Sequence, residues 1–352
     1  MRDEIEPVNL GGVMVGDAYP TVFMAEIGAF FDQDIDLALK YLHASAAAGA
    51  PVFKTEILLN PDICLAGTGT TYTFTHARGT AAEELRSIVE RKIVPKEGYQ
   101  RLFGECRALN LPFVCSVFDT EGIDLVVQEN GAGIKIARDN IDNIGLIRYA
   151  AATGLVLFFD AGNVTLDELA LAVRTARESG AGGIIINHHP AANPAPPEVH
   201  HLRVIETYKR MFQVPVGLAC HYRGNEIMYT AVGAGVNLIE KGIDADPDRL
   251  DLDLISAAGL AELPDIVRQV RNCWLALGQA IPQVREPRKT NFRKCLVAKK
   301  DISAGEKFTF DNLGFALPPL GIPPSFWDLI VGKEAAKDIA RNKVLSWEDI
   351  KL

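Results

Sequence analysis

The sequence lacks the features that would place this chain at a membrane or on a nucleic acid. No apolar run approaches the length of a membrane span, and the opening residues Met1 to Glu6 are too acidic and polar for a signal peptide. Lys and Arg number 36 against 45 Asp and Glu, so the formal net charge is -9. Nucleic acids and anionic membranes select for clustered positive charge, so neither is an expected partner. A local positive cluster could still bind a small anion.

Cysteine motifs and a glycine-rich phosphate loop are also missing. The six cysteines include no C-x-x-C pair, and a chain of 352 residues with 48% hydrophobic residues can build a large core without disulfides. Reduced thiols and a cytoplasmic location are therefore expected. Gly28, after the first predicted strand, is followed by Ala29-Phe30-Phe31 and not by G-x-G-x-x-G. This disfavours a doubly wound nucleotide-binding sheet.

What the sequence does contain is a repeated alternation of short apolar runs and longer amphipathic stretches, from about residue 22 to about residue 278. Helical patterns fill the gaps, for example Leu166 to Glu178 and Pro264 to Leu277, with Gly278 as a C-cap. The alternation predicts a (β/α)₈ TIM barrel. Its eight predicted strands are Val22 to Gly28, Val52 to Glu56, Phe113 to Phe118, Gly133 to Ala137, Leu155 to Ala161, Gly182 to His188, Val214 to His221 and Val236 to Ile243.

Two segments interrupt the barrel pattern. Leu58 to Arg78, rich in Thr and Gly, predicts a long active-site loop. A charged segment with two prolines predicts a linker over 281–290, which separates a barrel domain, 1–280, from a small domain, 291–352. In the small domain, Lys300 to Glu306 and Phe310 to Leu313 predict a strand, a turn and a short helical turn.

Two histidines stand where predicted strands end. His188 follows Ile184-Ile185-Ile186-Asn187, and His221 ends the run that begins at Val214. The carboxyl ends of barrel strands form the active-site face, so these imidazoles are candidate ligands of a catalytic metal. Position alone leaves open that either ring only hydrogen-bonds a loop. His189 is expected to point away, because successive strand side chains alternate.

Two lysines, Lys54 and Lys135, lie inside predicted strands, where an unpaired ammonium would be costly to bury. A phosphate or carboxylate ligand would satisfy them. The open alternative is an internal ion pair, for which the sequence offers several acids near strand ends: Glu26, Glu56, Asp119 and Asp160.

A set of short motifs runs along the predicted barrel: Ala25-Glu26-Ile27-Gly28, Lys54-Thr55-Glu56, Ser116-Val117-Phe118-Asp119, Lys135-Ile136-Ala137, Pro194-Ala195-Pro196-Pro197-Glu198, Val216-Gly217-Leu218 and Ile239-Glu240-Lys241. In order and spacing this set resembles the N-acetylneuraminate (sialic acid) synthase family, which includes spore coat polysaccharide biosynthesis protein E-like members. The tail, with Lys300-Asp301-Ile302, Asp311-Asn312-Leu313 and Gly332-Lys333, resembles the antifreeze-like (SAF) domain of that family.

The resemblance implies a barrel that condenses phosphoenolpyruvate with an aldose or aminosugar, followed by a β-clip SAF domain. It implies a divalent metal, Mn²⁺ with Mg²⁺ or Co²⁺ as alternatives, and a domain-swapped homodimer in which each small domain caps the partner's barrel. By position, Glu26 matches the catalytic carboxylate, whose alternative role is to neutralise Lys54. Lys54 and Lys135 match residues that hold phosphoenolpyruvate, Ser116 a phosphate contact, and His188 and His221 the metal ligands.

The departures from the family pattern fall on the sugar side of the site. Phe30-Phe31 replace an Asn-, His- and Gly-rich loop, and Arg138-Asp139-Asn140 replace Ser-Gly-Glu. Arg138 could take over phosphate binding through its planar guanidinium, whereas Asn140 replaces a carboxylate that contacts the acceptor. Leu317-Pro318-Pro319 replace an Arg-Pro-Gly whose arginine binds the N-acetyl sugar.

The leading hypothesis is therefore a phosphoenolpyruvate-dependent synthase of a 2-keto sugar acid for surface or spore-coat polysaccharide, with an acceptor other than N-acetylmannosamine. One alternative is a synthase-like scaffold with a binding or regulatory role. Another is a metal-dependent aldolase or lyase on the same barrel, which would not use phosphoenolpyruvate.

Overall fold

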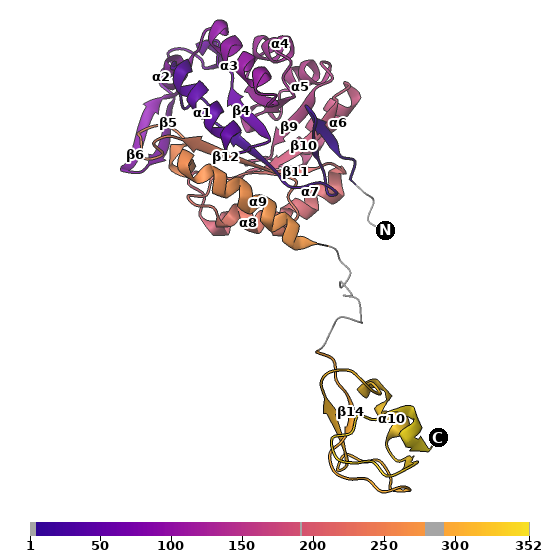
Figure 1. Cartoon of the computed structure of the whole chain (residues 1–352). Helices are drawn as coiled ribbons and strands as arrows, with labels where there is room; N and C mark the ends of the chain where they lie inside the picture. Colours follow the sequence, from indigo (N-terminus) through magenta and orange to yellow (C-terminus); the bar gives the residue numbers. More distant parts are fainter. Residues whose placement is uncertain (1–4, 191, 279–291, 352) are drawn as a thin grey trace. The chain divides into compact units, whose positions relative to one another are not determined.

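The chain forms two compact units, Met1–Gly278 and Gln279–Leu352, in a computed structural model that describes residues 5–190, 192–278 and 292–351 (Figure 1). The predicted linker over 281–290 lies outside the described residues. No helix in the described part of the chain is long and apolar enough to cross a bilayer.

The first unit is a closed barrel of eight parallel strands, because β11 pairs with β12 and β12 pairs with β3. This confirms the predicted TIM barrel. A ninth, two-residue strand, β13 (Ala258–Gly259), pairs in parallel with the end of β12. The barrel strands are β3 (Val22–Glu26), β4 (Val52–Glu56), β7 (Phe113–Val117), β8 (Gly133–Ile136), β9 (Val156–Asp160), β10 (Gly183–His188), β11 (Val216–Ala219) and β12 (Leu238–Asp244).

Helices lie outside the strands, as Figure 1 shows. Helix α6 begins with a capping box between Thr165 and Glu168, and α9 ends before Gly278, whose φ is 55°. The helices of this unit are α1 (Ile35–Ala47), α2 (Leu85–Lys92), α3 (Lys96–Ala108), α4 (Thr120–Gln128), α5 (Ile144–Ala151), α6 (Leu166–Glu178), α7 (Val204–Phe212), α8 (Glu226–Gly233) and α9 (Leu263–Leu277).

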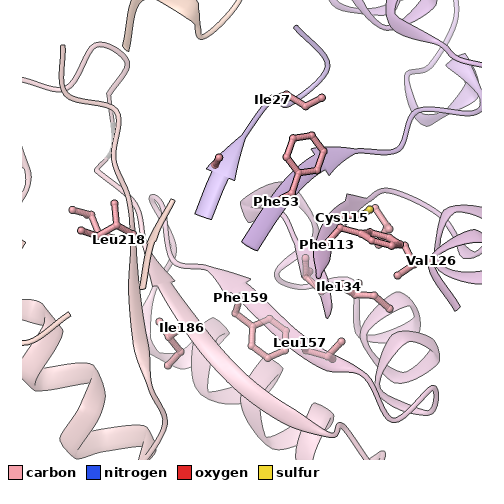
Figure 2. Packing of buried hydrophobic residues seen from close by; sticks show 14 of the residues in the cluster. Ile27, Phe53, Phe113, Cys115, Val126, Ile134, Leu157, Phe159, Ile186 and Leu218 are labelled. Atoms are coloured by element: carbon pink, nitrogen blue, oxygen red, sulfur yellow. The ribbon is translucent and has the colours of Figure 1, made fainter. Parts of the chain in front are cut away.

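The main hydrophobic core fills the layer between the strands and the helices. Figure 2 shows outward-facing strand side chains of this layer, among them Phe53, Phe113 and Phe159. Phe113 stacks on Phe103 of α3 with ring centroids 4.2 Å apart. This layer identifies the strand residues that point outward. The residues that alternate with them along each strand must point into the barrel.

A second apolar cluster fills the lower part of the barrel interior. The hairpin of β1 (Val8–Leu10) and β2 (Val13–Val15) packs Val8, Leu10 and Val15 against inward-facing strand residues. These are Val22, Met24, Val52, Val114, Val156, Phe158, Ile185 and Leu238. The amino-terminal end of the barrel is therefore a packed plug, and any cavity must open at the other end.

The predicted irregular loop over Leu58 to Arg78 is instead partly regular. A short 3₁₀ turn, Pro61–Ile63, precedes an antiparallel hairpin of β5 (Thr71–His76) and β6 (Gly79–Glu84). Alternating Thr and aromatic residues along β5 favour a strand over a loop. The predicted location at the active site holds, since Tyr72, Thr73, Phe74 and Thr75 line the barrel cavity.

The second unit has its own core of buried side chains, among them Leu296, Phe308 and Leu345. Its elements are β14 (Cys295–Ala298), β15 (Leu313–Ala316), α10 (Trp327–Ile330), β16 (Glu334–Ala335) and β17 (Ile350–Lys351). Of the predicted strand, turn and helical turn, the turn is present at Ala304 and Gly305, but Lys300 to Glu306 contains no regular strand, only the single bridge of Ile302 to Ile339. Phe310 to Asn312 is likewise a turn, and Leu313 opens β15.

Candidate active site

Strand alternation brings a ring of polar side chains to the carboxyl end of the barrel. On β3, Val22 and Met24 face the plug, so Glu26 faces the interior one level above them. The same count on the other strands places charged or amide side chains at this level: Lys54 on β4, Lys135 on β8, Asp160 on β9, Asn187 on β10 and Glu240 on β12.

These buried side chains form one continuous network. Lys54 Nζ lies 3.1 Å from Glu26 Oε1 and 3.4 Å from Glu240 Oε1. Lys135 Nζ lies 2.7 Å from Glu240 Oε1 and 3.1 Å from Asp160 Oδ2. Asn187 Nδ2 donates to Glu240 Oε2 at 2.6 Å. Both lysines therefore form the internal ion pairs that the sequence left open as an alternative. These ion pairs hold the two ammonium groups at the base of the cavity.

The network shifts the proton affinities of its members in opposite directions. Burial raises the pKa of Glu26 against the opposing charge of Lys54. Burial also acts to raise the pKa of Glu240, but Lys135 and Lys54 outweigh it and lower that pKa. Burial opposes the charge of Lys54, yet Glu240 and Glu26 raise its pKa. The lysines therefore stay charged, while Glu26 is the network member best suited to exchange a proton.

The two histidines that face the cavity are His189 and His221, and their rings stack with centroids 4.3 Å apart. The prediction that His188 faces the mouth and His189 points away is wrong. Asn187 points inward to Glu240, so alternation turns His188 outward, where its Nε2 donates to the His200 carbonyl at 2.6 Å.

The chemistry of the two cavity histidines fits a metal site. His189 Nδ1 lies 2.9 Å from Asp160 Oδ1, and since a carboxylate only accepts, Nδ1 carries a proton and Nε2 is the nitrogen that would bind a metal. A carboxylate that orients an imidazole in this way is a usual companion of metal ligands. Burial, followed by the charges of His189 and Lys135, holds the pKa of His221 well below its usual range, which keeps the ring neutral.

The described residues supply only two candidate metal ligands, His189 and His221. His221 Nδ1 is buried without a hydrogen-bond partner among the described residues. Those residues include no cluster of three or more His, Cys, Asp and Glu side chains arranged to hold a metal ion. Two imidazoles with open positions for water and substrate would suit a catalytic metal better than a structural one.

The network forms part of the lining of a cavity of about 840 Å³ at the barrel mouth. Of the residues predicted for the site, Glu26, Lys54, Lys135, Arg138, Asn140 and His221 line it. Arg138 and Asn140 lie on the 3₁₀ turn Arg138–Asn140 directly after β8. Ser116 is buried beside Lys135 in the β7–β8 register but does not line the cavity, and neither does His188.

The aromatic pair after β3 divides between site and core. Phe30 lines the cavity, whereas Phe31 packs into the layer under the helices, so only one of the two replaces polar lining. A Cβ placed on Gly242 would meet Phe30 Cε2 at 3.3 Å and Glu26 Oε2 at 3.5 Å. The Phe30 ring and the Glu26 carboxylate therefore share the same small space, and the ring helps exclude water from Glu26.

Sequence reasoning gave no site role to Glu240, Asn187 and His189. The signal was present in the alternation, because Leu238 and Ile185 belong to the plug and lie two residues before Glu240 and Asn187. Counting two more residues from Asn187 reaches His189. Asn193 and Asp253, which also line the cavity, come from loops and carry no such period.

Comparison with known protein families gives two matches. A model described as the NeuB family matches residues 41–282, and a model described as the SAF domain matches residues 293–351. The first covers more than half of the chain.

Individual relatives span nearly the whole chain. The spore coat polysaccharide biosynthesis protein SpsE of Bacillus subtilis is 28% identical, with 96% of this chain and 95% of the relative covered. An N,N'-diacetyllegionaminic acid synthase of Campylobacter jejuni is 26% identical, covering 92% and 98%. The crystal structure of an N-acetylneuraminic acid (sialic acid) synthetase from Leptospira borgpetersenii, in complex with citrate, matches with a TM-score of 0.72 at 23% identity, covering 81% and 94%.

Proposed function

Because this chain belongs to the NeuB family and carries a SAF domain, we propose that it is a sugar-acid synthase. The reaction joins C3 of phosphoenolpyruvate to the aldehyde carbon of an aldose or aminosugar. Water is consumed, inorganic phosphate is released, and a 2-keto sugar acid results. The product would serve surface or spore-coat polysaccharide, in line with the name of the spore coat relative.

The buried network at the barrel mouth is the observation that carries the proposal. Two ammonium groups and a carboxyl with a raised pKa lie at the base of an open cavity. A scaffold without chemistry would have no use for charges that are costly to bury, so the binding-only alternative is disfavoured.

Each network residue has a role in the proposed reaction. Lys54 and Lys135 would hold the phosphate and carboxylate of phosphoenolpyruvate, in exchange for part of their contact with Glu240. Arg138, whose side chain is 39% exposed at the mouth, would add a bidentate contact to one of these anions. Glu26 would move a proton to or from the reacting carbons or the water. Ser116, below the cavity lining, would at most contact a phosphate that enters deeply.

A divalent metal, Mn²⁺ or alternatively Mg²⁺ or Co²⁺, would be held by His189 and His221. When bound, it would supply a Lewis acid for the aldehyde oxygen. Asp160 would orient the His189 ring through Nδ1, and Lys135 would in turn hold Asp160. His188 is not part of this proposal, because its Nε2 is engaged by the His200 carbonyl.

The acceptor is proposed to differ from N-acetylmannosamine. Asn140 and Phe30 line the cavity where the family pattern has other residues. In the second unit Leu317 offers no charge for an N-acetyl group. The proposal includes a cytoplasmic location and a homodimer in which the small domains exchange. In support, that unit exposes Phe310 and Phe315, whose rings contact the half-buried Trp327, and Phe310 is 64% exposed.

The test is phosphate release from phosphoenolpyruvate with Mn²⁺ and a panel of aldoses and aminosugars. We expect metal-dependent release with at least one sugar, and a loss of about 10²- to 10⁴-fold in kcat for Glu26→Gln. Cleavage of a 2-keto sugar acid to pyruvate and an aldose, with no phosphoenolpyruvate or phosphate involved, would point to the aldolase alternative. No turnover across the panel with metal bound would contradict the synthase.

The metal assignment has its own control, because adjacent histidines point in opposite directions. His189→Asn and His221→Asn should lose stoichiometric Mn²⁺ in elemental analysis. His188→Asn should retain it. Retention of full metal content by His189→Asn would refute the assignment.

A further inference from the structure

Three residues that line the barrel mouth carry acceptor oxygens that receive no hydrogen bond from the described residues: both Glu56 carboxylate oxygens, Asp253 Oδ2 and Asn193 Oδ1. Glu56 at the end of β4, Asp253 before the 3₁₀ turn Leu254–Ser256, and Asn193 all line the cavity. Asn193 Nδ2 donates to Asp253 Oδ1 at 2.6 Å. This contact fixes the orientation of the Asn193 amide, because in the flipped orientation its own Oδ1 would face the Asp253 carboxylate. Asn193 Oδ1 is then buried with no partner among the described residues.

Glu56 differs from the other acids of the barrel interior. Glu26, Asp160 and Glu240 each lie within 3.4 Å of a lysine ammonium. In the described part of the chain, the Glu56 carboxyl makes no ion pair and accepts no side-chain hydrogen bond. Asp253 likewise has only the neutral amide of Asn193.

At both carboxyls burial outweighs the nearby cations, which are Lys54 and Lys135 for Glu56 and His189 and Arg138 for Asp253. Burial, together with the charges of Glu26 and Asp253 and against that of Lys54, raises the pKa of Glu56 to about 7. Burial also raises the pKa of Asp253. Both carboxyls are therefore held in a region that favours either a bound proton or a cation.

We propose that Glu56, Asp253 and Asn193 form a subsite for an ammonium group, so that the acceptor is an aldose with a free, unacylated amine. The inference rests on the proposed synthase function and specifies its acceptor. An ammonium offers three N–H donors and one positive charge. The acceptors that would receive them are the Glu56 carboxylate, Asp253 Oδ2 and Asn193 Oδ1.

Other common sugar substituents match this subsite less well. A hydroxyl offers a single donor and no charge. An acetamido group offers one N–H, and its carbonyl oxygen would meet only acceptors. Either would leave a carboxylate desolvated without a counter-charge. Strand β5, which supplies Tyr72 and Phe74 to the cavity lining, packs against the turn after Asp253 and limits the access of water. Water exclusion strengthens a charged hydrogen bond and increases the cost of an unmatched charge.

The experiment compares sugars that differ at a single substituent. Mannosamine, N-acetylmannosamine and mannose form one set, and 6-amino-6-deoxyglucose, its N-acetyl derivative and glucose form another. Binding to the full-length protein is measured by calorimetry with Mn²⁺ and phosphoenolpyruvate present, and phosphate release is measured in parallel. In at least one set, the free amine should bind more tightly than both counterparts by about tenfold or more.

Variants test whether the subsite is the source of this preference. Glu56→Gln should reduce the preference for the amine over its two counterparts by about tenfold. Glu121→Gln, the same substitution at an exposed carboxylate of α4 that pairs with Lys96, should keep the preference. An acetylated or hydroxyl sugar that binds as well as its amine in both sets, or an unchanged preference in Glu56→Gln, would overturn the inference.

The outcomes separate the subsite from the overall function. Phosphate release with an acetylated sugar and no amine preference would leave the synthase intact and refute the ammonium subsite. Preferential amine binding without phosphate release from any sugar would support the subsite and contradict the synthase.

Discussion

Replacing Lys135 by Met would remove the cation that joins two buried carboxylates. Lys135 Nζ lies 2.7 Å from Glu240 and 3.1 Å from Asp160, and its side chain is only 6% exposed. Methionine keeps most of the volume, so the change is mainly one of charge. Removing one partner of a buried ion pair costs about 3–5 kcal/mol, and the free energy of unfolding of a domain is about 5–15 kcal/mol. We expect Lys135→Met to lower the free energy of unfolding by about 3–5 kcal/mol at pH 7.5.

The pH dependence of this loss has a defined sign. In the native protein the pKa values of Asp160 and Glu240 are lowered, so their stabilisation is present above the unfolded values of about 3.9 and 4.3 and is lost as the pH falls through the folded values. In Lys135→Met both buried carboxyls lose one positive neighbour, while Glu240 keeps Lys54 and Asp160 keeps His189, so their pKa values rise. The variant then gains stability as the pH falls. Its deficit relative to the native protein should be smaller at pH 5 than at pH 7.5.

Urea unfolding followed by far-UV circular dichroism at both pH values measures this deficit. Arg210→Met is the control, because Arg210 pairs with Glu206 on the surface of α7 with a side chain 72% exposed, and it should change stability by no more than about 0.5 kcal/mol. An unchanged midpoint for Lys135→Met at pH 7.5 would refute the ion-pair network. An equal deficit at both pH values would assign the loss to packing instead of charge.

Further predictions concern the exclusion of water from Glu26 by Phe30 and the close packing of the barrel. Phe30→Asn should lower the pKa of Glu26 by admitting water, so the limb of the pH profile of kcat/KM that reports Glu26 should move to lower pH, and an unmoved limb would contradict the shielding role. Gly182→Ala should destabilise by about 1–3 kcal/mol in thermal or urea unfolding, because its Cβ would lie 2.0 Å from the Gly154 carbonyl oxygen. Gly104→Ala, inside α3 where a Cβ would meet only Arg107 Nη2 at 3.7 Å, should stabilise by about 0.5–1 kcal/mol, and equal effects of the two would refute the packing argument.

The barrel could be predicted because its signals are local. Continuous apolar runs such as Gly183–His188 and amphipathic runs such as Leu166–Glu178 follow from burial on two faces or on one. The β5–β6 hairpin was missed because Thr- and Gly-rich sequence is shared by loops and exposed strands. In the small unit, short strands and turns have too few residues for a period to be recognised.

The sequence by itself determined the fold class, the two-part organisation and the identity of most charged side chains at the barrel mouth, because each of these follows from pattern within one segment. Only the tertiary structure decided how those charges are paired and which histidine faces the cavity. His188 and His189 are adjacent in sequence, and a shift of one residue in strand register reverses which of them points inward. Lys135 and Glu240 lie 105 positions apart and meet only because the barrel closes through β12.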